Sequence, residues 1–184
     1  MNATEWLKRD HELILEALDL LETLIARAAA GSPIPAEKAR DLLDFFRTFA
    51  DDYHHLKEET SLFPALESAG LAAPVSVMLS EHDEGRDLLH LLEKSIGGLS
   101  LPTPRMDPAG SLAERYINLL REHIHKENDV LFRLAERILM PSEDEDISAA
   151  FESLEAGRAG GRAFPIYQKR IADLKAWAGR AGGQ

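Results

Sequence analysis

Histidine and glutamate recur at positions where a helical core would place apolar side chains. The apolar row that runs in steps of three and four residues from Leu7 to Ile25 is interrupted at His11, and three further rows are interrupted in the same way. Burying an imidazole without a partner costs about 1–3 kcal/mol, and burying a lone carboxylate costs more. The side chains that must therefore meet a cation or one another are His11, His54, Glu58, His82, His123 and Glu127.

Helix arithmetic places these six side chains at one level of a bundle. From His11 to an expected helix end near residue 29 is 18 residues, and from an expected start near residue 36 to His54 is also 18. From His82 to residue 96 is 14 residues, and from residue 110 to His123 is 13. At a rise of about 1.5 Å per residue these lengths nearly match, so we expect the six side chains to converge on one site.

Two ten-residue segments repeat one arrangement. HHLKEETSLF (54–63) and HIHKENDVLF (123–132) align without gaps and share His, Lys, Glu, Leu and Phe. A Glu flanked by His on each of two helices can bridge two metal ions, so four His and two Glu predict a dinuclear site with open coordination positions. We expect two iron ions with a bridging oxide or hydroxide, because this donor set suits chemistry with O2, NO or peroxide. Zinc and manganese are the alternatives.

Glycine and proline clusters cut the rest of the chain into helix-length pieces. Strand-like alternation is absent from the sequence, so an all-α protein is expected, with the first helix capped at Thr4. Short connections favour an up-down-up-down four-helix bundle over residues 1–140, followed by a C-terminal helical extension over residues 141–184 that packs on it. The four long helices are expected at residues 4–29, 36–67, 74–96 and 110–139.

Length and composition narrow the classes of partner. The 184 residues suffice for one compact core, and 32 acidic against 21 basic residues give a formal net charge of −11, which argues against a nucleic-acid partner. The chain has no cysteine, so metal ligands must come from His and carboxylates. No stretch of about 18 uncharged apolar residues occurs, so we expect a cytoplasmic protein without a membrane span.

The motifs resemble those of a known family. His11, the segment HHLKEETSLFP, EHDEGR (81–86) and HIHKENDVLF resemble the hemerythrin-like, His-His-Glu cation-binding domains over about residues 4–140. The resemblance implies a non-haem di-iron centre held by the same six side chains. Hemerythrins proper carry a further His where this chain has Arg86, and they place an acidic ligand where it has Asn128. The pattern is closer to that of di-iron proteins of iron–sulfur repair and nitric oxide response.

Three functions follow as hypotheses. The first is a di-iron protein that binds a small ligand such as O2 or NO, and the second is a di-iron enzyme that decomposes peroxide or converts NO, with an electron donor that the sequence does not identify. The third is a metal-free bundle whose buried His and Glu pair with each other. Residues next to the predicted ligands are expected in solvent-facing or ligand-supporting roles, with Glu59, Glu81 and His55 kept as alternative ligands; they are His55, Glu59, Glu81, His90 and His125. Arg86 is expected either to offer a cation to a carboxylate or bound anion near the site or to form a surface ion pair.

Overall fold

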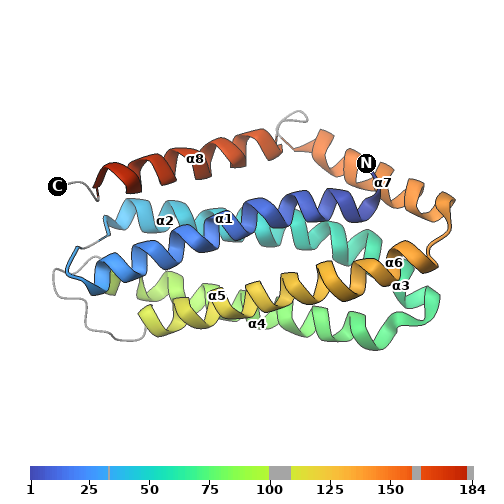
Figure 1. Cartoon of the computed structure of the whole chain (residues 1–184), viewed down its shortest axis with the longest axis horizontal. Coiled ribbons are helices and arrows are strands. Elements are labelled where there is room, and N and C mark those ends of the chain that lie inside the picture. The colour runs from blue at the N-terminus through green and yellow to red at the C-terminus, as the bar shows by residue number, and fades with distance from the viewer. Residues whose placement is uncertain (33, 100–108, 159–162, 182–184) are drawn as a thin grey trace.

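The computed structural model describes residues 1–32, 34–99, 109–158 and 163–181. Within these ranges the regular secondary structure is helical and contains no strand, which confirms the all-α prediction. Consecutive long helices run in opposite directions along the long axis of the molecule (Figure 1). Among the described residues, no helix combines the length and apolar character needed to cross a membrane.

Helix α1 (Ala3–Ala29) starts one residue earlier than expected and has a different cap. The side chain of Asn2 accepts the backbone N–H of Glu5 at 2.8 Å, and the Glu5 carboxylate accepts the N–H of Asn2 at 2.9 Å. The prediction of Thr4 as the cap is therefore wrong, because this reciprocal capping box already satisfies the helix start. Thr4 lies inside the helix, where its hydroxyl donates to Glu136.

The second long helix changes its hydrogen-bonding pattern several times along its length; we call the continuous helical run from Ala36 to Leu71 the second rod. Three of its segments are π-helical, and two of these contain or begin at the predicted ligands of this helix. The rod ends at Gly70, whose φ of 92° turns the chain toward the third helix. Its segments are α2 (Ala36–Phe45), η1 (Phe46–His55), η2 (Glu58–Leu62), α3 (Phe63–Leu66) and η3 (Glu67–Leu71).

The third and fourth helices complete the bundle, and two more helices lie outside it. α4 (Ala72–Leu99) packs along α5 (Ala109–Lys126), which continues through η4 (Glu127–Leu131) into α6 (Phe132–Ile138). The extension consists of α7 (Pro141–Gly157) and α8 (Ala163–Ala181), and both helices pack against α1 (Figure 1). A domain boundary at residue 140 stays a prediction.

The apolar core is divided into two clusters. The larger cluster contains Leu13, Leu18 and Phe46, and the smaller one contains Leu7, Phe63 and Phe132. Each predicted ligand row passes from one cluster to the other through a buried polar layer, as α1 does between Leu7 and Leu13 at His11. The two clusters thus exclude water from the predicted site on both sides.

The turn at Gly70 gives a test of the fold that is independent of the site. Gly70→Ala should lower the free energy of unfolding by about 1–2 kcal/mol, because a Cβ disfavours positive φ. Gly179→Ala is the matched control: both glycines have open space where a Cβ would project, but Gly179 lies in helical conformation in α8. Urea unfolding of the control should show no loss, and an equal loss in both variants would contradict the assignment of the turn.

Candidate metal centre

The structure brings all six predicted side chains together in one buried layer. Each is at most 1% exposed. The Glu58 carboxylate lies 3.6 Å from Nε2 of His54 and 3.5 Å from Nε2 of His82. The Glu127 carboxylate lies 3.2 Å from Nε2 of His11 and 3.3 Å from Nε2 of His123. Four imidazoles from four helices therefore point the same ring atom at two central carboxylates.

The other ring nitrogen of each histidine faces an outer oxygen. Nδ1 of His82 lies 2.7 Å from Glu59, Nδ1 of His123 lies 3.0 Å from Glu81, and Nδ1 of His11 lies 2.9 Å from the Asn128 side-chain oxygen. Nδ1 of His54 faces Asp10 at 3.7 Å. We assign the proton to Nδ1 in each ring because its neighbour is an acceptor. Such outer oxygens orient metal-ligating histidines and leave the Nε2 lone pair free.

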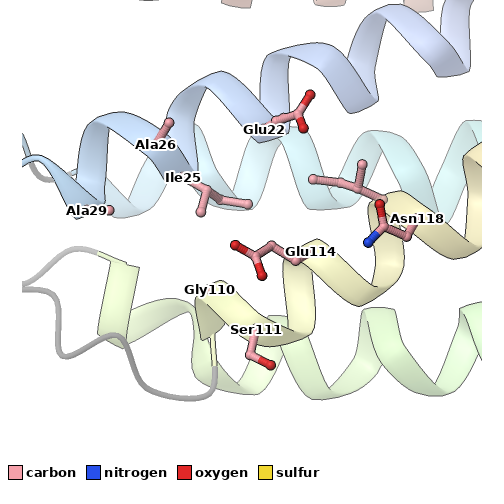
Figure 2. Close-up of a pocket in the computed structure, with 9 residues that line it drawn as sticks. Glu22, Ile25, Ala26, Ala29, Gly110, Ser111, Glu114 and Asn118 are labelled. Carbon is pink, nitrogen blue, oxygen red and sulfur yellow. The ribbon is translucent and has the colours of Figure 1, made fainter.

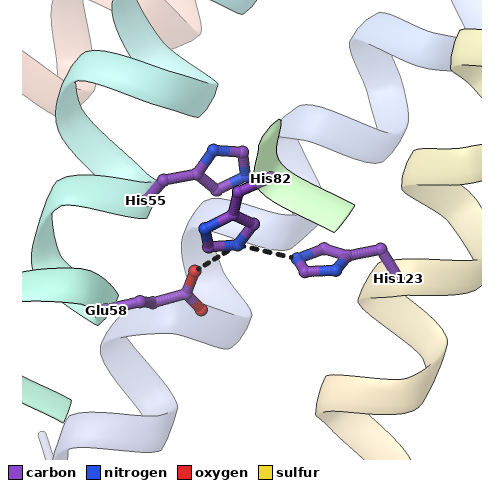
Figure 3. Close-up of side chains that lie close together, drawn as sticks. All are labelled: His55, Glu58, His82 and His123. Carbon is purple, nitrogen blue, oxygen red and sulfur yellow. Dashed lines mark hydrogen bonds and ion pairs between the residues drawn. The ribbon is translucent and has the colours of Figure 1, made fainter. Parts of the chain in front are cut away.

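With the proton on Nδ1, the lone pairs of the Nε2 atoms and of the carboxylate oxygens face one another at the centre of the site. Nε2 of His82 lies 3.1 Å from Nε2 of His123 (Figure 3), a separation that matches neighbouring nitrogen ligands each about 2.1 Å from one ion. Among the described residues, both oxygens of Glu58, both oxygens of Glu127 and Nε2 of His11 are buried without a hydrogen-bond partner. Acceptors gathered in this way fit a bound cation.

The electrostatics of the layer favour a cation for the same reason. Burial lowers the pKa of His54 to about 4 and also lowers the pKa of His82, so both imidazoles are neutral at pH 7. Burial and the charge of Glu127 raise the pKa of Glu58 well above its ordinary value. Burial opposes the charged form of His123 too, but Glu127 and Glu81 raise the pKa of His123. The layer is thus short of positive charge, which a metal ion would supply.

His55 joins the site although its position on a regular helix predicts a supporting role. It is 5% exposed, and its ring stacks on that of His82 with centroids 3.7 Å apart. His55, Glu58, His82 and His123 each bring one donor atom within 4.8 Å of the others, as do His11, His54, Glu58 and Glu127. Two groups of four donors therefore share Glu58, which is the arrangement expected of a bridge between two ions.

Two adjacent histidines, His54 and His55, both face inward at the end of a π-helical segment. In an α-helix, His54 and His55 would be separated by about 100° around the axis. Both lie at the end of η1, where i→i+5 hydrogen bonds widen the turn and reduce the rotation between successive residues. Glu58 and Glu127 each begin a further π-helical segment, so the aligned repeats adopt the same local distortion.

The repeat found in the sequence extends to a two-fold arrangement of the whole site. Phe63 stacks on His82 with centroids 5.6 Å apart, and its counterpart Phe132 stacks on His11 at 5.5 Å. The shared lysines bind the carboxylates that face the repeat histidines, Lys57 with Asp10 and Lys126 with Glu81. The histidine, lysine, glutamate and phenylalanine shared by the two segments therefore have the same role in both halves.

The remaining candidate residues lie around this centre. Arg86 donates to Asp51 at 2.8 Å and to Glu59 at 2.6 Å, so its guanidinium holds the carboxylates that face His55 and His82. Glu59 and Glu81 support histidines. His125 and His90 are exposed and lie away from the layer. The sequence did not predict that Asp10 and Lys57 are buried beside the site. The lysine shared by the two repeated segments could have indicated a role for Lys57.

A separate pocket lies near the C-terminal end of α1 and the N-terminal end of α5 (Figure 2). It is lined by apolar residues such as Ile25 and by the carboxylates of Glu22 and Glu114, without a histidine among its described lining. Glu22 is eleven residues from His11, or roughly 16 Å along the helix, so this pocket is not part of the metal centre.

The fold and the site together define a helical bundle with a buried histidine–carboxylate cluster compatible with a di-iron centre. Comparison with protein families agrees, because residues 2–135 match the family described as the hemerythrin HHE cation binding domain. The chain belongs to this family. No solved structure gives a significant match.

Relatives fall into two groups by how much of the chain they match. An uncharacterized Mycobacterium tuberculosis protein is 28% identical over 177 residues, which cover 95% of this chain and 69% of that protein. The iron–sulfur cluster repair protein DnrN of Neisseria gonorrhoeae is 34% identical over 131 residues, which cover 66% and 80%. The iron–sulfur cluster repair protein YtfE of Escherichia coli is 31% identical over 128 residues, which cover 66% and 55%.

Because the buried Glu58 carboxylate has no hydrogen-bond partner, we predict that its replacement has opposite effects on stability in metal-free and in metal-loaded protein. In metal-free protein, Glu58→Gln should raise the free energy of unfolding by about 1–3 kcal/mol, because it removes a buried carboxylate that lacks a partner. In metal-loaded protein the same change should lower stability, because a predicted metal ligand is lost. Urea unfolding with and without a chelator measures both.

Glu122→Gln, at an exposed position of α5, is the matched control and should change neither state. An equal loss of stability in both states of the Glu58 variant would instead identify Glu58 as a structural partner of the histidines. That outcome would support the metal-free bundle.

Proposed function

We propose that this chain is a non-haem di-iron protein that binds a small ligand, with nitric oxide the leading candidate, and acts in a stress response. The observation that carries this proposal is the set of Nε2 and carboxylate lone pairs that face one another in a buried layer. The kinship with iron–sulfur cluster repair proteins supports the stress role.

Two groups of residues would each hold one metal ion. We assign His55, His82 and His123 to one position and His11 and His54 to the other. Glu58 belongs to both groups, and Glu127 belongs to the second group and lies 3.3 Å from Nε2 of His123 in the first. Bound iron would supply Lewis acidity and electrons to a small ligand. The side chains fix the spacing of the ions, and the outer oxygens hold each imidazole in the metal-binding tautomer.

The surroundings suit a small uncharged ligand better than a large substrate. Phe63 and Phe132 stack on ligand histidines from the smaller apolar cluster, and the larger cluster begins one turn away on the other side. Apolar walls exclude water from the layer and leave its donors to the ions and to a ligand that enters without a hydration shell. Diatomic molecules meet this condition.

Metal content tests the proposal directly. Protein purified in air should contain about two iron ions per chain and show ferric charge-transfer absorption, because the seven donors suit a pair of ions. His54→Ala should lower the iron content to about one ion or less, and His55→Phe should change the absorption spectrum by removing a nitrogen donor. Elemental analysis and visible spectroscopy measure both.

His90→Ala, on the exposed side of α4, is the control and should keep the wild-type iron content and spectrum. Fewer than about one metal ion per chain in the wild type, with a melting temperature that chelation leaves unchanged, would reject a metal function.

Ligand addition separates binding from catalysis. Nitric oxide added to the reduced protein without oxygen should change the visible spectrum in a saturable way, and His54→Ala should abolish the change, because this histidine holds one of the two ion positions. Stopped-flow absorption measures the reaction. Repeated turnover of peroxide by the wild type, lost in the same variant, would favour the enzyme hypothesis over ligand binding.

A further inference from the structure

The internal two-fold arrangement continues from the metal site to the protein surface. Residues of α1 correspond to residues of α4 that lie 71 positions later, as His82 follows His11. Residues of the second rod correspond to residues of the fourth that lie 69 positions later, as His123 follows His54. Each surface feature of one half can therefore be compared with its counterpart in the other half.

In the first half, α7 covers the groove between α1 and η2. Ile147 and Phe151 of α7 belong to the same apolar cluster as Leu7 and Leu62 on the groove floor. The cation of Lys57, 5.9 Å from the Phe151 ring, is completely buried beneath this helix. At the edge of the contact, Glu155 of α7 lies 3.6 Å from Arg9.

In the second half, the corresponding groove lies between α4 and η4. Met78 and Leu131, the counterparts of Leu7 and Leu62, form its buried floor. Val77 and Val130 stand at the rim with 50% and 56% of their surface exposed, and the described part of the chain places no helix over them. The groove has a volume of about 190 Å³. Helix α4, which forms one side of it, lies across the bundle from α7 in the view of Figure 1.

We propose that this groove is a docking site for an amphipathic helix of a partner protein. The structure indicates the chemistry of that helix, because α7 fills the equivalent groove with two apolar residues four positions apart, Ile147 and Phe151, followed by an acidic residue four positions later. In the first half the acidic residue contacts Arg9, whose counterpart is Ser80. The cation left for an acidic residue in this groove is therefore Lys126, which lines it and whose side chain is 40% exposed where its counterpart Lys57 is buried.

The occupant is a partner rather than a second copy of this chain. The helix of this chain that has the required pattern is α7, and it is already packed on its own α1. A second copy could dock in the same way only by releasing α7, which would expose Phe151 and uncover the buried ion pair of Lys57 with Asp10. A free helix from another protein has no such cost.

Docking would also reach the metal centre. Lys126 pairs with Glu81, and Glu81 accepts the Nδ1 proton of His123 at 3.0 Å. An acidic residue bound to Lys126 would compete with Glu81 for this cation. Lys126 and Glu81 would therefore link the proposed partner to His123, a predicted ligand of the metal.

The test uses a peptide of residues 141–157, lactam-bridged to hold a helix and labelled with fluorescein, as the probe for the full-length chain. We expect saturable binding by fluorescence anisotropy with a dissociation constant of about 0.1–1 mM, since the contact is small. Val130→Asp should weaken binding at least about tenfold by placing a charge at the rim. Leu91→Asp, at a position of α4 that is 47% exposed, is the matched control and should bind as the wild type does.

Two outcomes would overturn the proposal. One is the absence of binding at several times the expected dissociation constant, or binding that Val130→Asp leaves unchanged. The other is a wild-type dimer, seen by light scattering, that Val130→Asp dissociates, because the groove would then hold a second copy. A peptide that carries Phe151→Ala should fail to bind. None of these measurements depends on the metal content of the protein.

Discussion

The structure depends on a buried layer in which electron-pair donors face one another. Four Nε2 atoms and two carboxylates occupy the middle of a largely apolar core, and outer oxygens stand behind the imidazoles. Helix packing can bring such groups together, but it cannot remove the repulsion between their lone pairs. Positive charge at the centre does so, and for this reason the layer suits metal ions before any reaction is considered.

The site is assembled from one unit used twice. Each unit is a helix with an acidic residue before its His, followed by a helix with His, Lys, Glu and Phe. It supplies three of the six predicted ligands, carboxylate oxygens behind the imidazoles and one phenylalanine ring that stacks on a histidine. The two units exchange contacts, because Glu59 of one supports His82 of the other and Asn128 supports His11. Neither half completes its own histidine environment, so the site exists only when all four helices are packed.

Much of this could be predicted from the sequence. Apolar spacing predicted the long helices, and counting residues from the turns was enough to place six donors at one level. The prediction that His55 supports the site from outside assumed that a residue about 100° from the ligand row faces away from the site, but His55 is 5% exposed and stacks on His82. Asp10 was not predicted because a charged residue beside a ligand normally faces solvent, and here it is buried between Lys57 at 2.7 Å and Arg9 at 3.0 Å, which neutralise it. Such pairing depends on tertiary contacts, which spacing along one helix does not contain.

The two halves of the site differ at two positions that would affect the bound metal ions. One repeat has His55 where the other has Ile124, and Glu59 where the other has Asn128, so the position near His82 has one more nitrogen and more negative charge behind its imidazoles. Negative charge behind a ligand makes the imidazole a stronger donor and favours the more oxidised ion. Two ions held here would therefore be chemically unequal. Since the two segments share His, Lys, Glu and Phe, this inequality comes from the few positions at which they differ, and it would give a small ligand one preferred position to bind.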